Sequence, residues 1–185
     1  MNDIIPAILA TSISDLDHKI SEIPEKIRLV HIDVLEKDIW ADTHKDFEAH
    51  LMVLNPEEIV ECWVKRGAKK IIVHKLNDVI KGLKGMVEIG LGVELNVPLE
   101  EMFSFVPEVD FIHLMSIAEM GGQGRPLDEV IFDRIRKLKE KFPQVPISVD
   151  GGINVTNYQA LRDAGANRLI VGSGFKDLWK SLTKS

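Results

Sequence analysis

The chain has 185 residues, of which 45% are hydrophobic and 28% charged, and its formal net charge is −6. This composition is that of an ordinary globular protein with one sizeable core, so we expect a single domain over residues 1–185. There is no basic stripe for nucleic acid and no apolar run long enough for a membrane, and the first residues are not expected to act as a signal peptide. The one cysteine, Cys62, excludes an internal disulfide and is typical of a reducing compartment, which predicts a cytoplasmic protein.

Eight short apolar runs are predicted to be strands. They lie at residues 4–9, 29–34, 48–53, 70–74, 92–96, 111–116, 146–150 and 168–172. Helical patterns separate most of them, so neighbouring strands are expected to pair in parallel. Eight such units predict a shortened (β/α)₈ barrel, also called a TIM barrel.

The helical segments are recognised by their ends and by their apolar period. Ser12 can cap the first helix, while Asn55 and Pro56 begin a later one that ends before Gly67. Further helices or helical turns are predicted at residues 77–90, 98–106, 126–142, 154–165 and 175–182. The segment 77–90 is the weakest of these, because Gly82 and Gly85 interrupt it.

The connection between the second and third strands breaks the pattern. Residues 35–47 have no apolar helical period, so the second helix is predicted to be missing or reduced to a turn. The outward apolar face of the second strand then needs a cover, either from Ile39 and Trp40 or from another subunit. Because an uncovered apolar patch promotes association, we expect a homo-oligomer.

Four residues of metal-ligand type are predicted to face the barrel interior near the C-terminal ends of their strands. They are His31, Asp33, His50 and Asp150. Active sites of such barrels lie at that end, and two imidazoles with two carboxylates suit Zn²⁺, Fe²⁺, Mn²⁺ or Co²⁺. One such ion would offset the cost of burying two carboxylates. The alternative is a scattered set of buried histidines and a salt-bridged aspartate.

The motifs also resemble, in their order, those of one enzyme family. "HIDV", "EAHLMV", "HLMS", "GGQ", "SVDGGI" and "VGS" are similar to segments of ribulose-phosphate 3-epimerases, and the likeness extends from "PAIL" to "VGSG". The resemblance implies a metal-dependent isomerase of the pentose phosphate pathway. Its implied substrate is a phosphorylated ketose, with D-ribulose 5-phosphate and D-xylulose 5-phosphate as the leading pair.

The resemblance also implies roles for individual residues. His31, Asp33, His50 and Asp150 match the family's metal ligands, and Asp33 and Asp150 also match its acid–base pair. Inverting a carbon next to a ketone requires one group to remove a proton and another to deliver one to the opposite face, through an enediolate. A metal ion stabilises such developing negative charge.

Matches to substrate-binding positions lie in the pocket and in the loops after strands six, seven and eight. They are His50, Met52, Met115, Gly121, Gly122, Gly151, Gly152, Gly172 and Ser173. Glycine lets backbone N–H groups approach a phosphate closely. Taken without the resemblance, the methionines are core residues and each glycine pair is a turn.

The chain departs from the family pattern in four places. Ala7 stands where the family has a serine that contacts the substrate, and Leu35 stands where it has a methionine of the pocket. The "MSIAEMGGQ" loop is one residue shorter than the family's loop, and the family's second helix has no counterpart in this sequence. These departures favour a second interpretation, a degenerate barrel that binds metal or a phosphosugar without turnover. A phosphosugar aldolase or decarboxylase on a related barrel is a weaker third.

Three further polar residues belong to the predicted interior. Glu94 and His113 lie where the family places apolar side chains, and strand parity predicts that they form a buried hydrogen-bonded pair beneath the site. The alternative is that one of them turns to solvent. His74 ends the fourth strand, where it can either line the pocket or serve in packing.

Overall fold

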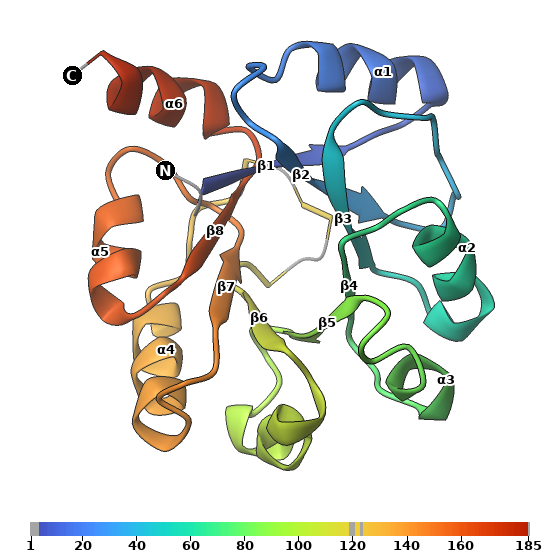
Figure 1. Cartoon of the computed structure of the whole chain (residues 1–185). Helices are drawn as coiled ribbons and strands as arrows, with labels where there is room; N and C mark the ends of the chain where they lie inside the picture. Colours follow the sequence, from blue (N-terminus) through green and yellow to red (C-terminus); the bar gives the residue numbers. More distant parts are fainter. Residues whose placement is uncertain (1–3, 119–120, 123, 185) are drawn as a thin grey trace.

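The computed structural model describes residues 4–118, 121–122 and 124–184, which form a closed parallel barrel (Figure 1). The strands of this described part follow one another around the ring in chain order, and β8 pairs with β1. They are β1 (Ile4–Leu9), β2 (Leu29–Val34), β3 (Asp46–Leu51), β4 (Lys70–Val73), β5 (Glu88–Val93), β6 (Phe111–Met115), β7 (Ile147–Asp150) and β8 (Arg168–Val171). The predicted (β/α)₈ barrel is therefore confirmed.

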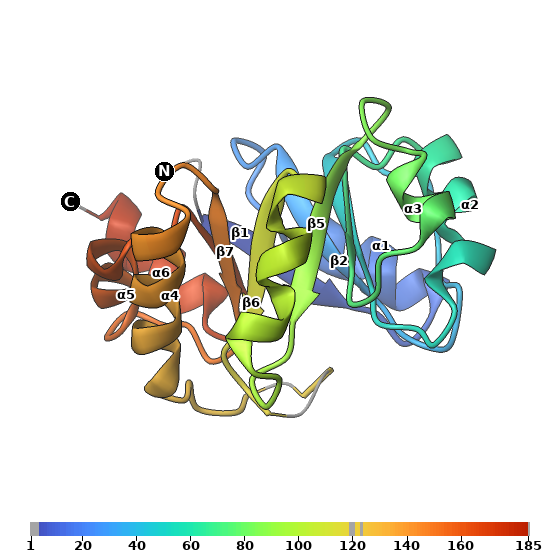
Figure 2. The same ribbon diagram turned by 90° about the horizontal axis from the view of Figure 1, so that it is seen from below.

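Helices and helical turns surround the ring on its outside (Figure 2). They are α1 (Ile13–Ser21), the 3₁₀ turn η1 (Pro56–Glu58), α2 (Val60–Lys65), α3 (Asp78–Lys81), the 3₁₀ segment η2 (Leu99–Glu108), α4 (Val130–Lys141), α5 (Tyr158–Ala164) and α6 (Phe175–Thr183). The cap predicted at Ser12 forms, since its side chain accepts a hydrogen bond from the backbone N–H of Asp15. Within the described residues, none of these helices has the length and apolarity that a membrane crossing requires.

Two predicted boundaries are wrong around the third and fifth strands. Strand β3 begins at Asp46 instead of residue 48, and β5 begins at Glu88 instead of residue 92. The helix predicted over 77–90 ends at Lys81, because Gly82 caps it and Gly85 follows with a φ of +87° that other residues rarely adopt. The chain is thereby free to start β5 early.

Glycines in β5 make room for large rings inside the barrel. A Cβ built on Gly90 would lie 2.4 Å from Cζ of Phe111, and one built on Gly92 would lie 2.8 Å from the His74 ring. Both rings occupy space that a side chain on β5 would otherwise fill. Strand β5 therefore needs glycine at positions 90 and 92.

The second helix is absent, as predicted. Residues 35–45, all within the described part of the chain, form no helix. Trp40 instead folds back onto the sheet, with its ring centroid 4.6 Å from that of Phe47 on β3 and 5.4 Å from that of Trp63 on α2. Ile39 packs against the same core.

An ion pair holds this cover in place. The guanidinium of Arg66 donates two hydrogen bonds to the Asp38 carboxylate, at 2.6 and 2.8 Å, and lies over the rings of Trp40 and Trp63. The outward side chains of β2 and β3 are buried within one chain as a result. Of the two covers expected for this face, Ile39 and Trp40 therefore provide it, and the homo-oligomer stays a prediction without that support.

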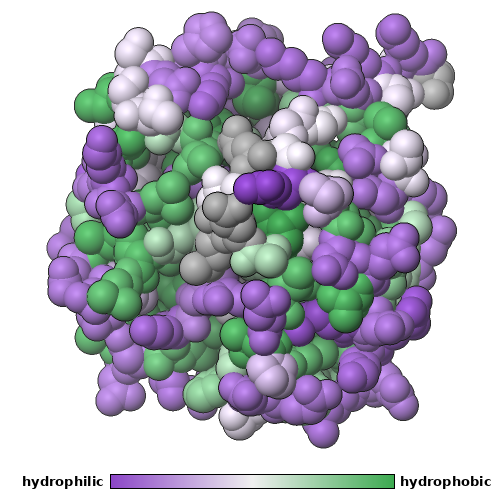
Figure 3. Space-filling model, turned by 180° about the vertical axis from the view of Figure 1, so that it is seen from behind, coloured by the Kyte–Doolittle hydropathy of each residue, from purple (hydrophilic) through white to green (hydrophobic). Residues whose placement is uncertain are grey.

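Alternation along the strands separates two environments. Outward side chains join the apolar core between sheet and helices. The fully buried polar side chains of the described strands lie inside the barrel: they are His31, Glu48, His50, His113 and Ser148. Figure 3 shows one outer face of the molecule, where hydrophilic residues occupy most of the periphery and hydrophobic residues form smaller groups between them. The unusual feature of this protein is therefore the group of polar side chains buried inside the barrel.

Candidate active site

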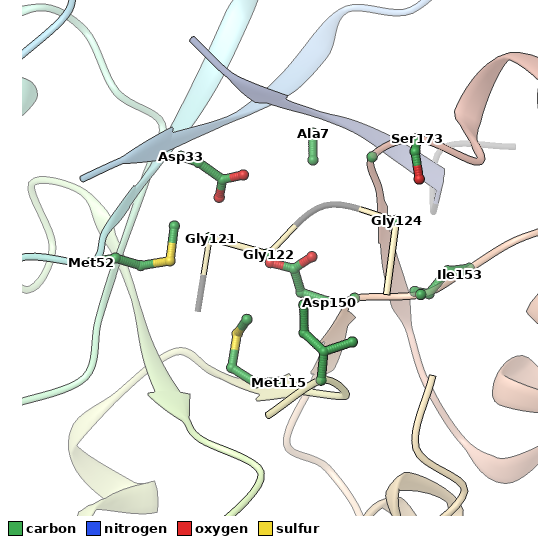
Figure 4. Close-up of a pocket in the computed structure, with 14 residues that line it drawn as sticks. Ala7, Asp33, Met52, Met115, Gly121, Gly122, Gly124, Asp150, Ile153 and Ser173 are labelled. Atoms are coloured by element: carbon green, nitrogen blue, oxygen red, sulfur yellow. The ribbon is translucent and has the colours of Figure 1, made fainter. Parts of the chain in front are cut away.

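A pocket lies at the C-terminal ends of the strands. The carboxylates of Asp33, from β2, and Asp150, from β7, point into it, and Met52 and Met115 line one side (Figure 4). The full lining comprises Ala7, Asp33, Met52, Met115, Ile117, Gly121, Gly122, Gly124, Asp150, Gly151, Gly152, Ile153, Gly172 and Ser173. The structure therefore brings together nearly all the predicted substrate-binding positions; His50 lies beneath them and is fully buried.

The four predicted metal ligands converge below this pocket. His31 Nε2 lies 3.3 Å from His50 Nδ1, 3.3 Å from Asp33 Oδ1 and 3.8 Å from Asp150 Oδ2. His50 Nδ1 lies 3.5 Å from Asp33 Oδ1 and 3.7 Å from Asp150 Oδ2. Among the described residues, Asp33 Oδ1 is buried without a hydrogen-bond partner.

These separations fit a divalent cation. Four tetrahedral ligands bound at about 2.1 Å lie about 3.4 Å from one another, close to the distances between the imidazole nitrogens and carboxylate oxygens here. His31, His50, His113 and Asp150 also form a buried group whose ligand atoms all lie within 4.8 Å of one another. The donor set, imidazole and carboxylate, is the one that suits first-row transition metals.

A buried carboxylate orients His31. The Nδ1 of His31 donates to Glu48 Oε1 at 2.7 Å, so the neutral ring has its lone pair on Nε2, facing the cluster. Glu48 is itself fully buried and accepts a hydrogen bond from Arg168, which reaches it from β8. Burial acts to raise the pKa of Glu48, but its bonds to His31 and the charge of Arg168 lower that pKa to about 2.

A second histidine orients His50. The Nε2 of His50 lies 2.9 Å from Nε2 of His74, so one of these two nitrogens donates to the other. Burial, together with the neighbouring His50 and His113, lowers the pKa of His74 to about 3 and keeps it neutral. When His74 accepts, His50 carries its proton on Nε2 and its Nδ1 lone pair faces the cluster.

The predicted pair of Glu94 and His113 is wrong. The side chain of Glu94 is 44% exposed, and its Oε1 lies 3.8 Å from Nδ1 of the neutral His74 ring. His113 stays inside, with its Nε2 3.3 Å from Asp150 Oδ2. Glu94 follows the end of β5, where the chain leaves the barrel and its side chain can reach water, which outcompetes a buried partner.

Electrostatics keep the two aspartates ionised. Burial acts to raise the pKa of each carboxyl group, but contacts with His31 and His50 for Asp33, and with His113 and His50 for Asp150, hold both pKa values below their usual range. Burial lowers the pKa of His31, and Asp33 and Glu48 overcome it and raise that pKa to about 10. A cation would compete with such protons, because metal ligands bind in their deprotonated form.

The glycine-rich loops have conformations that require glycine. Gly121, Gly151 and Gly152 have φ values of +72°, +114° and +65°. A Cβ on Gly152 would lie 2.3 Å from the backbone nitrogen of Leu127, so no other residue fits there. Part of the "MSIAEMGGQ" loop, residues 119, 120 and 123, lies outside the described residues.

Sequence reasoning missed Glu48 and the position of His113 in the cluster. Glu48 precedes His50 by two residues, so strand parity already indicated that it faces inward. Arg168, its partner, lies 120 residues further along the chain, and only the closed ring brings the two together. The sequence therefore indicated that Glu48 faces the barrel interior, but it did not indicate that Arg168 is its partner.

Together the fold and the cluster define a (β/α)₈-barrel protein with a metal-type site at the C-terminal mouth. The profile of the family described as "Ribulose-phosphate 3 epimerase family" matches residues 3–176. The chain belongs to the ribulose-phosphate 3-epimerase family.

Individual relatives agree with this assignment. The chain is 29% identical to the ribulose-phosphate 3-epimerase of Chlamydia trachomatis over 199 residues, which cover 93% of this chain and 85% of that protein. It is 29% identical over 134 residues to the enzyme of that name from Schizosaccharomyces pombe, covering 69% of this chain and 58% of the yeast protein. The crystal structure of 3-hexulose-6-phosphate synthase from Salmonella typhimurium superposes with a TM-score of 0.70 at 13% identity, covering 95% of this chain and 90% of that one, and supports the fold alone.

Proposed function

We propose that this chain is a metal-dependent 3-epimerase of a ketose phosphate, with D-ribulose 5-phosphate and D-xylulose 5-phosphate as the leading pair. The observation that carries the proposal is that Asp33 and Asp150 enter one pocket from strands that are not adjacent in the sheet (Figure 4). Two carboxylates so arranged can reach opposite faces of one carbon. Family membership supports the same reaction.

The proton steps follow from the two carboxylates. One aspartate, ionised because its imidazole neighbours lower its pKa, removes the proton next to the ketone. The other first takes a proton from water and then delivers that proton to the opposite face of the enediolate. Each aspartate side chain is 13% exposed, so water can exchange protons with both between turnovers. Reversal of the two roles gives the reverse reaction.

The same cluster would hold one divalent ion. Its ligands would be His31, His50, Asp33 and Asp150, with Glu48 and His74 as positioning residues for the two rings. When bound, the ion would supply positive charge that stabilises developing negative charge on the substrate oxygens. The protein's own contribution is to fix the ring directions and to hold the two carboxylates at the edge of the pocket, each largely buried.

The phosphate end of the substrate would lie against the loops after β6, β7 and β8. Gly172 and Ser173 stand just before α6, whose first N–H groups favour an anion. Gly151 and Gly152 present backbone in conformations without a side chain in the way. Met52 and Met115 would cover the apolar part of the sugar chain.

The alternative is a barrel that binds metal or a phosphosugar without turnover. Ala7 lines the pocket with a methyl group where the family pattern has a hydroxyl, and Leu35 replaces a pocket methionine beside it. Neither change touches the aspartates, which is why the active enzyme remains our proposal. The single free cysteine is consistent with a cytoplasmic location.

The test is to measure bound metal and conversion of ribulose 5-phosphate for the wild type and for Asp33→Asn and Asp150→Asn. Each substitution should lower kcat by about 10²–10⁴-fold. Exchange of the C3 proton with solvent deuterium should persist in one variant and not the other for a given substrate. The exposed Asp17→Asn is the control and should be unaffected.

Three outcomes would contradict the proposal. Full turnover in either aspartate variant would remove the acid–base pair. Bound metal without turnover on any ketose 5- or 6-phosphate would favour the binding protein. Absence of metal after reconstitution with all four candidate ions would contradict both interpretations.

A further inference from the structure

His113 is a buried histidine to which the proposed mechanism gives no role. It lies on β6 and is fully buried, and within the described part of the chain neither ring nitrogen has a hydrogen-bond partner. A buried polar group without a partner destabilises a fold, so an imidazole at this position needs a physical reason that an aliphatic side chain would not.

The ring of His113 lies among those of the metal-type cluster. It stacks on His31, with centroids 5.5 Å apart and planes 6° from parallel, and meets His50 edge-on at 4.6 Å. An imidazole binds a metal ion through the lone pair of one ring nitrogen, and His113 Nε2 lies on the side of the ring that faces Asp150. One ligand atom from each of His31, His50, His113 and Asp150 lies within 4.8 Å of the others.

A hydrogen bond to Asp150 does not explain why position 113 is a histidine. His113 Nε2 is 3.3 Å from Asp150 Oδ2, yet the contact does not have the geometry of a hydrogen bond. They lie side by side, as two ligand atoms around a common centre do. Neighbouring ligands bound at about 2.1 Å lie about 3.0–3.4 Å apart, and opposite ligands about 4.2 Å.

We propose that Nε2 of His113 is a further ligand of the divalent ion. The centre then contains three imidazoles, one each from β2, β3 and β6, together with the Asp150 carboxylate. This inference rests on the metal site of the proposed function and extends its donor set. More imidazole donors favour Zn²⁺, Fe²⁺ or Co²⁺ over Mn²⁺, and they leave Asp33 more available for proton transfer.

The test compares metal binding by the wild type, His113→Leu and a matched control, Leu114→Met. Leu114 is the next residue on β6, equally buried but packed in the outer core. Metal-stripped proteins are titrated with Co²⁺ and with Zn²⁺. His113→Leu should weaken binding of both ions by about ten-fold or more and change the visible spectrum of the Co²⁺ form, whereas Leu114→Met should bind like the wild type.

Two further measurements separate ligation from a structural role. X-ray absorption of the Zn²⁺-loaded protein should count three imidazoles in the wild type and two in His113→Leu. Without metal, His113→Leu should melt at a temperature equal to or above that of the wild type, because it removes a buried imidazole that has no partner.

The outcomes distinguish this inference from the proposed function. A wild type with one bound ion and only two imidazoles, or a His113→Leu variant with unchanged affinity, would overturn the role of His113 and leave the proposed function standing. A wild type that binds neither ion would overturn both. If the variant did not fold, the imidazole count of the wild type would decide.

Discussion

The buried ion pair between Glu48 and Arg168 should contribute strongly to stability, and a double-mutant cycle measures that contribution. Glu48 is fully buried, and the Arg168 side chain is 13% exposed. Glu48→Leu leaves the Arg168 guanidinium without its carboxylate, and Arg168→Met leaves the Glu48 carboxylate with its hydrogen bond to His31 but without its cation. Breaking a buried pair in this way costs about 3–5 kcal/mol. Glu48→Leu and Arg168→Met should each lower the free energy of unfolding by that amount.

The double variant should lose far less than the sum of the two. It contains no unpaired charge, and its main defect is His31 Nδ1 without its acceptor, which costs about 1–3 kcal/mol. The two single losses add up to at least about 6 kcal/mol, so the coupling free energy should be about 3 kcal/mol or more.

The assay is urea unfolding of the metal-stripped proteins at pH 7, so that altered metal affinity does not enter the result. The exposed pair of Glu61 and Lys65 on α2 is the control, and alanine substitutions there should show a coupling of no more than about 0.5 kcal/mol. A buried-pair coupling as small as that of the control would refute the reasoning.

Three other perturbations have expected outcomes. Removing metal with a chelator should lower the melting temperature by about 5–10 °C relative to protein with free metal 100-fold above its Kd, and calorimetry would contradict the metal site if it found no shift. Gly90→Ala should lower the free energy of unfolding by about 1–3 kcal/mol because its Cβ would meet the Phe111 ring, whereas Gly172→Ala, which meets nothing within 4 Å, should unfold like the wild type in urea. Trp40→Ala should cost about 2–3 kcal/mol and expose the β2–β3 face, and light scattering should then detect more self-association than in the wild type at the same concentration.

The strands were predictable because each is a short, mostly apolar segment with a clear face. Strand β5 was the exception, since its first residues, 88–90, were assigned to the preceding helix, although the Phe111 ring fills the space of a side chain at position 90. A glycine's partner across the barrel is not encoded in its local pattern. Boundary errors therefore arose where tertiary packing, not propensity, chose the conformation.

For the candidate site, the sequence predicted which side chains face the barrel interior but not which of them contact one another. Parity placed His31, His50 and Asp150 inward, and the structure brings them together. The same rule suggested that Glu94 and His113 would pair, but Glu94 lies beyond the last residue of β5 and turns to solvent. Contacts that cross the barrel depend on ring closure and on strand stagger, which a single sequence does not specify.

The loop that replaces the second helix has two tasks, one at the pocket and one outside the sheet. At one end Leu35 stands against the Gly121 turn at the mouth of the pocket, and a few residues later Trp40 covers the aromatic core outside the sheet. A longer helical connection would keep those tasks apart. In this protein, a substitution that loosens Trp40 outside the sheet would also move Leu35 at the entrance of the pocket. The stability of the barrel and its ligand specificity are therefore linked through this loop.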